Sequence, residues 1–413
     1  MDALIILAVF LGCVFASVPI GFAIGLSCVA YSMFTGSVNM GYIASGLFAS
    51  CDSFPLMAIP FFILSGALME GGGLSKRLVN FFDSLVGHFT GGLAIVTVIT
   101  CLFFGAISGS GPATTAAIGA IMVPTMVEKG YDKKFAMALV AASGCLGVII
   151  PPSIPMVSYG ISVNASIATM FMGGFLPGIL LGGLLILTAV WILRKEGFTG
   201  SGDPFSWSRV WVSFKDAIWA LMCPAIILGG IYSGFFTPTE AAVVSVVYAL
   251  LVGFFAYKEL TLANAYKKIA EAACTHGTVN IIVGTSTILG RVLTLEQIPD
   301  AVANAMLSIT DNKIVMLMII NVLLLGCGCL LETNSSILIL APILFPVVSS
   351  LGVDIVHFGL IMVVNLAIGF ITPPVGVNLF VACGIGKIPF ADLVKRIIPF
   401  LLAMLLGLII ITY

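Results

Sequence analysis

Charged side chains are scarce in this chain of 413 residues. Only 8% of the residues are Asp, Glu, Lys or Arg, whereas 60% are hydrophobic. An average soluble domain carries about 25% charged residues, because polar side chains have to cover most of its surface. The shortage of charge excludes a soluble globular protein and predicts an all-α polytopic membrane protein.

Other absences exclude further classes of function. The net charge is −1 and the basic residues are scattered, so no basic surface for nucleic acid is expected. The sequence has no GxxxxGKS/T motif for ATP hydrolysis, and no HExxH motif or carboxylate cluster for an intramembrane enzyme. The ten cysteines form no CxxC pair and lie mostly in apolar segments, which indicates reduced hydrophobic residues. We expect no enzyme activity, no cofactor and no metal other than sodium.

Nine apolar segments are long enough to cross a bilayer, which takes about 20 residues. The first is expected to be a retained helix rather than a signal peptide, because no basic segment precedes it. The nine segments are 3–34, 42–70, 135–162, 166–193, 217–234, 238–257, 272–290, 355–384 and 389–412.

Two further apolar stretches, 92–127 and 314–350, are interrupted halfway by small and polar residues at 108–115 and 332–336. Each half has only about 16 to 18 residues, and backbone groups at such a break cannot be left facing lipid. We therefore predict two re-entrant helical hairpins with their tips inside the protein. The alternative is a pair of short spans joined by a loop outside the membrane.

The basic residues indicate an orientation. With nine crossings and two hairpins, 15 of the 17 fall on one side, and only Arg291 and Lys313 fall on the other. The positive-inside rule places the richer side in the cytoplasm. This topology predicts a cytoplasmic N-terminus and a C-terminus on the outside of the membrane.

The chain contains an internal duplication. Each copy has two spans, an amphipathic arm (74–88 or 295–309), a hairpin, a broken span and a final span, and the extra span at 217–234 inverts the second copy. Inverted repeats with discontinuous helices are typical of secondary transporters. A shift of 222 residues superposes Pro124 on Pro346, Gly130 on Gly352, Asp132 on Asp354, Gly147 on Gly369, Pro151 on Pro373, Pro152 on Pro374 and Pro177 on Pro399.

Each copy has a span interrupted by a proline pair. Two consecutive prolines remove two backbone donors, and the glycine four residues before them permits unwinding. The freed carbonyl groups can coordinate a hard cation such as sodium, and the helix that follows each hairpin tip offers unpaired N–H groups to an anion. The carbonyls concerned lie at or near Gly144, Gly147, Gly369 and Thr372.

We predict that the hairpins and broken spans move as a transport unit, over residues 92–165 and 314–388. Residues 1–91, 166–313 and 389–413 are assigned to the scaffold. Polar side chains of the tips and breaks are the candidates for binding an anionic substrate: Thr114, Ser153, Glu332, Asn334, Ser335 and Asn378.

Three isolated charges have alternative interpretations. Glu332 opens the second tip, where it has either a functional role or the role of capping the next helix. Glu240 follows Thr237 and Pro238, which favours a capping role. Arg291 faces either the path of the anion or the outer interface, and the sequence does not distinguish the two.

The chain resembles the large membrane subunit (M subunit) of the tripartite ATP-independent periplasmic (TRAP) transporters. The resemblance covers essentially the whole chain, and it implies a sodium-driven, elevator-type transporter of the ion-transporter superfamily that imports carboxylate-bearing solutes. The segments that carry it are GSGPATTA at 109–116, GVIIPPS at 147–153, FTPTEAA at 236–242, ETN at 332–334 and GFITPPVG at 369–376.

The resemblance also implies partners and ion sites. It implies a location in a bacterial inner membrane, with the C-terminus in the periplasm. The partners are a periplasmic binding protein and a small four-helix membrane subunit (Q subunit), expected here either as a separate polypeptide or as a part that was removed. By analogy, the first sodium site uses Ser108, Ser110 and carbonyls around Gly144, Gly147 and Pro151. The second uses Gly328, Thr333, Asn334 and carbonyls around Gly369, Thr372 and Val375.

Other functions remain open at this point. A stand-alone carboxylate symporter or antiporter of the same superfamily would need no binding protein, and a channel could also use re-entrant loops. C4-dicarboxylates, sialic acid, keto acids and other acid sugars all fit the scaffold, so the sequence does not identify the substrate.

Overall fold

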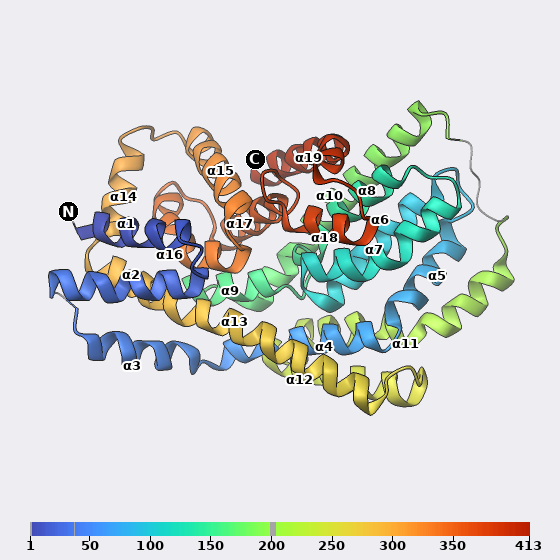
Figure 1. Ribbon diagram of the computed structural model, residues 1–413, viewed down its shortest axis with the longest axis horizontal. Coiled ribbons are helices and arrows are strands. Elements are labelled where there is room, and N and C mark those ends of the chain that lie inside the picture. Colours follow the sequence, from blue (N-terminus) through green and yellow to red (C-terminus); the bar gives the residue numbers. More distant parts are fainter. Residues whose placement is uncertain (1, 37, 199–203) are drawn as a thin grey trace.

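The computed structural model describes residues 2–36, 38–198 and 204–413, and this part of the chain is helical without strands (Figure 1). The first copy comprises α1 (Asp2–Phe15), α2 (Ile20–Thr35), α3 (Met40–Cys51), η1 (Phe54–Met57), α4 (Ala58–Gly71), α5 (Leu74–Val86), α6 (Gly92–Ser108), α7 (Gly111–Glu128), α8 (Lys133–Gly144), η2 (Cys145–Val148), α9 (Ile154–Val163) and α10 (Ile167–Lys195). After α11 (Trp207–Tyr232), the second copy comprises α12 (Pro238–Leu251), η3 (Val252–Ala256), α13 (Leu262–Leu295), α14 (Ile298–Leu307), α15 (Lys313–Leu330), α16 (Thr333–Ser350), α17 (Ile355–Gly369), α18 (Val377–Gly386) and α19 (Phe390–Thr412).

The duplication is visible in the helix boundaries. Shifted by 222 residues, α16 superposes on α7 at both ends, and α15 superposes on α6 to within one residue. Gly130 and Gly352 both take positive φ angles, +87° and +72°, where the chain leaves these helices. Two residues later, Asp132 and Asp354 accept hydrogen bonds from the first N–H groups of α8 and α17. The recurring residues therefore repeat a helix end and a helix start.

The N-terminal segment differs from its prediction. A single span over 3–34 is wrong, because α1 and α2 are separate helices that pack against each other. The chain turns at Ser17, which has a φ of +61°, and Pro19 precedes α2. Hydropathy does not reveal this turn, since no charged residue marks it. The local sign of the turn is Pro19, because proline is favoured at a helix start, where its missing N–H costs nothing.

This hairpin changes the topology. Gly21 of α2 lies beside Ile281 and Ile282 of α13, and Val38 packs in the same cluster as Leu293 near the end of α13. At the other end of the chain, the Tyr413 hydroxyl donates to the carbonyl oxygen of Ile314 at the start of α15. The cytoplasmic N-terminus was predicted on the assumption that residues 3–34 cross the membrane once. Because these residues form two helices, that assumption does not hold.

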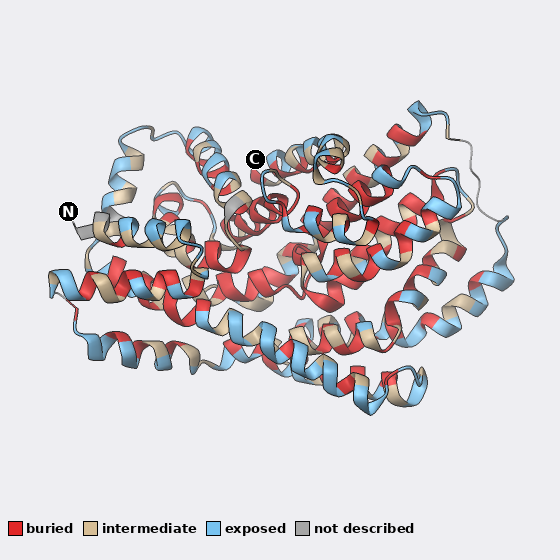
Figure 2. Ribbon diagram, viewed as in Figure 1, coloured by how far each residue is buried: buried red, intermediate tan, exposed pale blue. Residues whose placement is uncertain are grey.

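The broken spans occupy the centre of the molecule, as Figure 2 shows. Every residue from Phe135 to Gly144 of α8 is buried, and so is every residue from Phe358 to Gly369 of α17. A helix that is buried all round needs no polar face, which explains the unbroken apolar sequence of both segments. Several surrounding helices, among them α2, α12 and α19, expose large apolar side chains, as expected for helices that contact lipid.

Two groups of helices surround this centre. The long α13 packs along α3 and α4, and α12 packs on α4. In contrast, α10 and α19 pack on each other and on the broken spans, α10 also against α6 and α19 also against α18. At one end of this second group, Arg396 of α19 pairs with Asp132 and Glu196, and Lys134 pairs with Asp392.

Candidate functional site

Both predicted hairpins are present, with buried tips. α6 ends at Ser108, Gly109 takes a φ of +60°, and α7 returns from Gly111. The Ser110 side chain accepts a hydrogen bond from the N–H of Ala113 and caps α7. Ser108 and Gly109 are buried, so this turn lies inside the protein rather than in a loop outside the membrane.

The second tip has a carboxylate in the equivalent position. Glu332 caps α16, since its side chain accepts a hydrogen bond of 2.9 Å from the N–H of Ser335. The same carboxylate accepts one of 2.8 Å from Nδ2 of Asn334. The capping role considered for Glu332 is thus confirmed. The shift of 222 residues places Glu332 on Ser110, so the two copies use different side chains for one task.

The first break packs directly on the first tip. A Cβ atom on Gly147 would lie 2.8 Å from the carbonyl oxygen of Ser110, and one on Gly105 would lie 2.7 Å from Cα of Gly147. The Thr114 hydroxyl lies 2.9 Å from the Ser108 hydroxyl and donates to the carbonyl oxygen of Ser110. Only glycine permits this approach, so the tip hydroxyls and the carbonyls of the break share one small volume.

The position of Gly144 completes this cluster. A Cβ atom on Gly111 would lie 3.2 Å from the carbonyl oxygen of Gly144. One on Gly109 would lie 3.0 Å from the carbonyl oxygen of Pro152, which follows Pro151. The structure therefore brings together the residues predicted for the first ion site.

The second break repeats the arrangement with other residues. A Cβ atom on Gly369 would collide with the backbone of Gly328, and one on Gly328 would lie 3.2 Å from Cα of Leu366. The Thr372 hydroxyl donates to the carbonyl oxygen of Ile368. Thr333 and Asn334 are buried at the adjacent tip, whereas Val375 is 37% exposed.

A cavity of about 540 Å³ lies between the two tips. Its wall contains pairs of residues that the shift of 222 superposes, one from each copy, so the cavity lies on the pseudo-twofold axis of the repeat. These pairs are Ser110 with Glu332, Pro112 with Asn334, Val148 with Phe370 and Pro155 with Val377.

The remaining wall is formed by α4 and α13 and is not symmetric. It carries Glu70, Lys268 and Glu271 at one end, where the Lys268 ammonium lies 3.1 Å from Glu70 and 3.6 Å from Glu271. This is the end of α13 on the side rich in basic residues. Sequence reasoning missed these residues, because nothing in the sequence places α13 opposite the tips.

The residues predicted to bind substrate fall into two sets. Glu332 and Asn334 line the cavity. Thr114, Ser153, Ser335 and Asn378 are fully buried and make structural hydrogen bonds. Ser153 caps α9, and Nδ2 of Asn378 donates to the carbonyl oxygen of Ala141 at 3.0 Å.

The two copies are interlocked around the cavity. The second half of each broken span packs on the returning helix of the other copy's hairpin, α9 on α16 and α18 on α7. A hydrogen bond of 3.1 Å joins the Ser158 hydroxyl of α9 to Oδ1 of Asn334 at the second tip. The second tip is thereby hydrogen-bonded to the broken span of the first copy.

Comparison with known proteins agrees with this architecture. Residues 7–413 match the family described as the tripartite ATP-independent periplasmic transporter, DctM component. The chain belongs to this family. Its helices and the inverted hairpins thus form the large permease component of a TRAP transporter, a membrane protein rather than an enzyme.

Individual relatives support the assignment. The chain is 49% identical over 396 residues to the isethionate TRAP transporter permease protein DctMQ of Oleidesulfovibrio alaskensis, covering 96% of this chain but only 62% of that longer protein. It is 39% identical to the C4-dicarboxylate TRAP transporter large permease protein DctM of Rhodobacter capsulatus, covering 100% of this chain and 97% of that one. Its identity to the sialic acid TRAP transporter large permease protein SiaM of Vibrio cholerae is 39%, over 97% and 93% of the two chains.

The fold also has a solved counterpart. The structure of the Alcanivorax borkumensis YdaH transporter, described as having an unusual topology, superposes with a TM-score of 0.66 over 90% of this chain and 86% of that one. Sequence identity is 15%, so this likeness supports the fold alone.

Proposed function

We propose that this permease imports a small organic acid together with sodium ions, taking the acid from a periplasmic binding protein. The observation that carries the proposal is the cavity between the two hairpin tips. There, the N-terminal ends of α7 and α16 converge from both copies of the repeat, beside Val148 and Phe370 of the two breaks. Helix N-termini stabilise an anion, and uncharged oxygen groups coordinate sodium.

Sodium is the proposed coupling ion because the tips offer mainly hydroxyl and carbonyl oxygens, with Glu332 as the one carboxylate of segments 108–115 and 332–336. At the first tip these are the oxygens of Ser108, Ser110 and Gly144 around Gly147. At the second, they belong to Thr333, Asn334 and Thr372 near Gly369. Each sodium ion that moves inward along the membrane potential contributes about 2.3 kcal/mol per 100 mV.

The proposed movement is that of an elevator, in which a rigid unit carries the cavity past a fixed scaffold. The packing favours a larger moving unit than the sequence suggested. Because α10 and α19 pack on α6, α8 and α17, we assign them to the moving unit instead of the scaffold. The Lys134–Asp392 and Arg396–Asp132 ion pairs then lie within the unit, where they need not break during transport.

The substrate class follows from chemistry that the relatives share. Their names refer to C4-dicarboxylates, sialic acid and isethionate, all of them organic acids. We propose a carboxylate or a sulfonate as the group bound near Asn334. The relative named for isethionate makes a sulfonate the first acid to test.

The proposed partners are the periplasmic binding protein and a small four-helix membrane subunit, in a bacterial inner membrane. The N-terminal hairpin changes the proposed orientation. With the basic end of α13 in the cytoplasm, the start of α1 and the end of α19 both lie on the periplasmic side.

The test is uptake into proteoliposomes that contain the permease and its small subunit. Uptake of the cognate acid should require both an inward sodium gradient and the loaded binding protein. Uptake without a gradient would refute sodium coupling. Uptake without the binding protein would instead favour a stand-alone symporter, and conductance that does not saturate would favour a channel.

A further inference from the structure

A second polar groove lies between the scaffold and the proposed moving unit, at the opposite end of α13 from Lys268. Its volume is about 440 Å³. One wall comes from α3 and α13, the other from α9 and α16. The residues that line it include Tyr42, Ser162, Asn164, Ser286, Arg291 and Thr294.

Arg291 is the cation of this groove. Its guanidinium lies close to α3, since a Cβ atom on Gly46 would be 3.6 Å from Nη1. Among the described residues, no carboxylate lies within ion-pair distance of it. A guanidinium presents several donors in a plane that matches an oxyanion, and one without a carboxylate partner is available for an external anion.

A second observation points to a ligand at the same place. The Ser286 hydroxyl belongs to a fully buried residue of α13 that lines the groove, and it has no hydrogen-bond partner in the described structure. Buried hydroxyl groups are normally paired, so an unpaired one next to a polar groove indicates a missing partner. Ser162 and Asn164 add further donors to the lining of the groove.

The two ends of α13 differ in charge. Lys268 lines the central cavity, but Glu70 and Glu271 neutralise it. Arg291 lies 23 residues further along the same helix, about 35 Å away. Lys313 is the only other basic residue that the sequence predicts on the same side of the protein as Arg291. The attraction for anions at this end is therefore concentrated at the groove.

We propose that this groove is an outer anion subsite, in which Arg291 and the neighbouring hydroxyls hold the acid group of the substrate before it reaches the cavity. The subsite deepens the proposed function and rests on it, because the anion is taken to be the transported organic acid. The alternative occupant with the same chemistry is the phosphate of an anionic lipid headgroup. The position of the groove against α9 and α16, the helices next to Asn334, favours the substrate.

The test uses Thr294→Cys, an exposed position on the same helix face as Arg291, in the whole 413-residue chain in phosphatidylcholine nanodiscs. The rates of modification by a negatively and a positively charged thiosulfonate are compared, with peptide mass spectrometry to separate residue 294 from the native cysteines. Adding Arg291→Gln should lower the ratio of the two rates about fivefold, because a unit charge about 6 Å away is removed. Arg291→Lys should retain most of the ratio, and Lys313→Gln should leave it unchanged.

A second arm identifies the anion. Isethionate, succinate and N-acetylneuraminate are added at constant ionic strength, and at least one should slow modification severalfold in the parent but not in the Arg291→Gln variant. An unchanged rate ratio in Arg291→Gln, or no protection by any of the three acids, would overturn the subsite. Protection by phosphatidylglycerol alone would also overturn it, in favour of a lipid.

The two proposals can fail separately. Sodium-driven uptake with an unchanged labelling ratio would leave the proposed function in place and refute the subsite. Protection by an acid without any sodium-driven uptake would support an anion site at Arg291 and refute the transport function.

Discussion

The hydroxyl of Ser158 donates a hydrogen bond of 3.1 Å to Oδ1 of Asn334. The donor belongs to the broken span of the first copy and the acceptor to the hairpin tip of the second. Nδ2 of Asn334 in turn donates to Glu332, the residue that caps α16. One carboxamide thus links a helix break, a hairpin tip and a helix cap around the cavity.

This link predicts the effect of Ser158→Ala. The variant removes the donor that orients the Asn334 carboxamide, at a cost of about 1 kcal/mol. If Asn334 helps to bind sodium, the sodium concentration for half-maximal uptake should rise severalfold, while the maximal rate changes less. Thr188→Ala is the matched control, because that hydroxyl donates to Leu184 within its own helix. An unchanged sodium dependence would show that the bond does not position the site.

The second prediction concerns substitution of the glycines at the two breaks. Gly147→Ala and Gly369→Ala should each abolish uptake and lower the thermal midpoint, since the added methyl group meets the backbone of Ser110 or Gly328. Overpacking of this kind costs about 1–3 kcal/mol. Gly183→Ala in α10 has open space around the Cβ position and should be neutral or stabilising. Normal uptake by Gly147→Ala would contradict the close approach of tip and break.

Two variants of Glu332 can separate the contribution of its helix cap from that of its negative charge. Glu332→Gln keeps an oxygen that can accept from the N–H of Ser335, whereas Glu332→Ala removes the cap and should cost about 1 kcal/mol. The thermal midpoint should therefore fall in Glu332→Ala and change little in Glu332→Gln. Uptake measured on Glu332→Gln then reports the role of the negative charge in the cavity. Equal destabilisation by both variants would show that the charge, rather than the cap, stabilises the tip.

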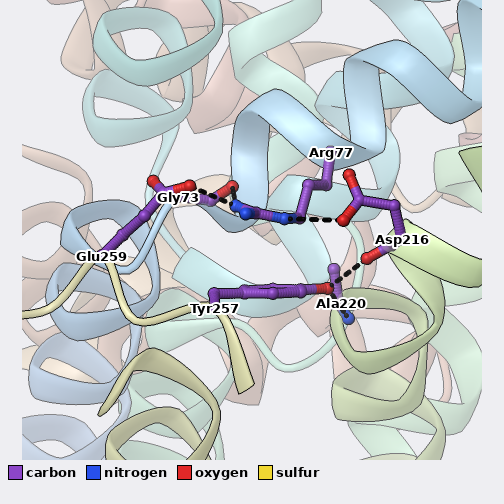
Figure 3. Close-up of polar contacts among 6 residues, drawn as sticks. All are labelled: Gly73, Arg77, Asp216, Ala220, Tyr257 and Glu259. Carbon is purple, nitrogen blue, oxygen red and sulfur yellow. Dashed lines mark hydrogen bonds and ion pairs between the residues drawn. The ribbon is translucent and has the colours of Figure 1, made fainter. Parts of the chain in front are cut away.

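A fourth prediction concerns the first arm, α5. Figure 3 shows Arg77 of this arm lying over the ring of Tyr257, between Asp216 and Glu259, with distances of 3.2 Å and 2.7 Å to the two carboxylates. The Tyr257 hydroxyl donates a hydrogen bond of 2.8 Å to the carbonyl oxygen of Asp216. These contacts fasten the arm to α11 and to the segment after η3.

Arg77→Gln should therefore lower the thermal midpoint by an amount equivalent to about 1–2 kcal/mol, because a planar cation that bridges two carboxylates and stacks on a ring is lost. Lys76→Gln removes the same charge from the adjacent exposed position, and it should stay within about 0.5 kcal/mol of the parent. If the two variants were equally stable, the cluster would not anchor the arm.

Much of the architecture could be predicted because it depends on local chemistry that the sequence states directly. Apolar halves that are too short to span, with a polar interruption between them, already define the hairpins, and the recurring Pro, Gly and Asp residues define the repeat. Glu240 is an example at the level of one residue. Its carboxylate accepts from the N–H of Thr237 in a capping box, as Pro238 and the spacing predicted.

Other features depended on which helices meet in space. The α1–α2 turn at Ser17 has no charged residue, so the hydropathy of 3–34 does not distinguish two packed helices from one span. Lys268 and Arg291 lie on one helix, but their roles depend on α4, α9 and α16, which come from distant parts of the chain. The sequence by itself determined the hairpins, the breaks and the repeat, because backbone hydrogen bonding in a membrane leaves few alternatives. Only the tertiary structure decided which side chains face the cavities, because helix packing fixes the rotation and depth of each helix.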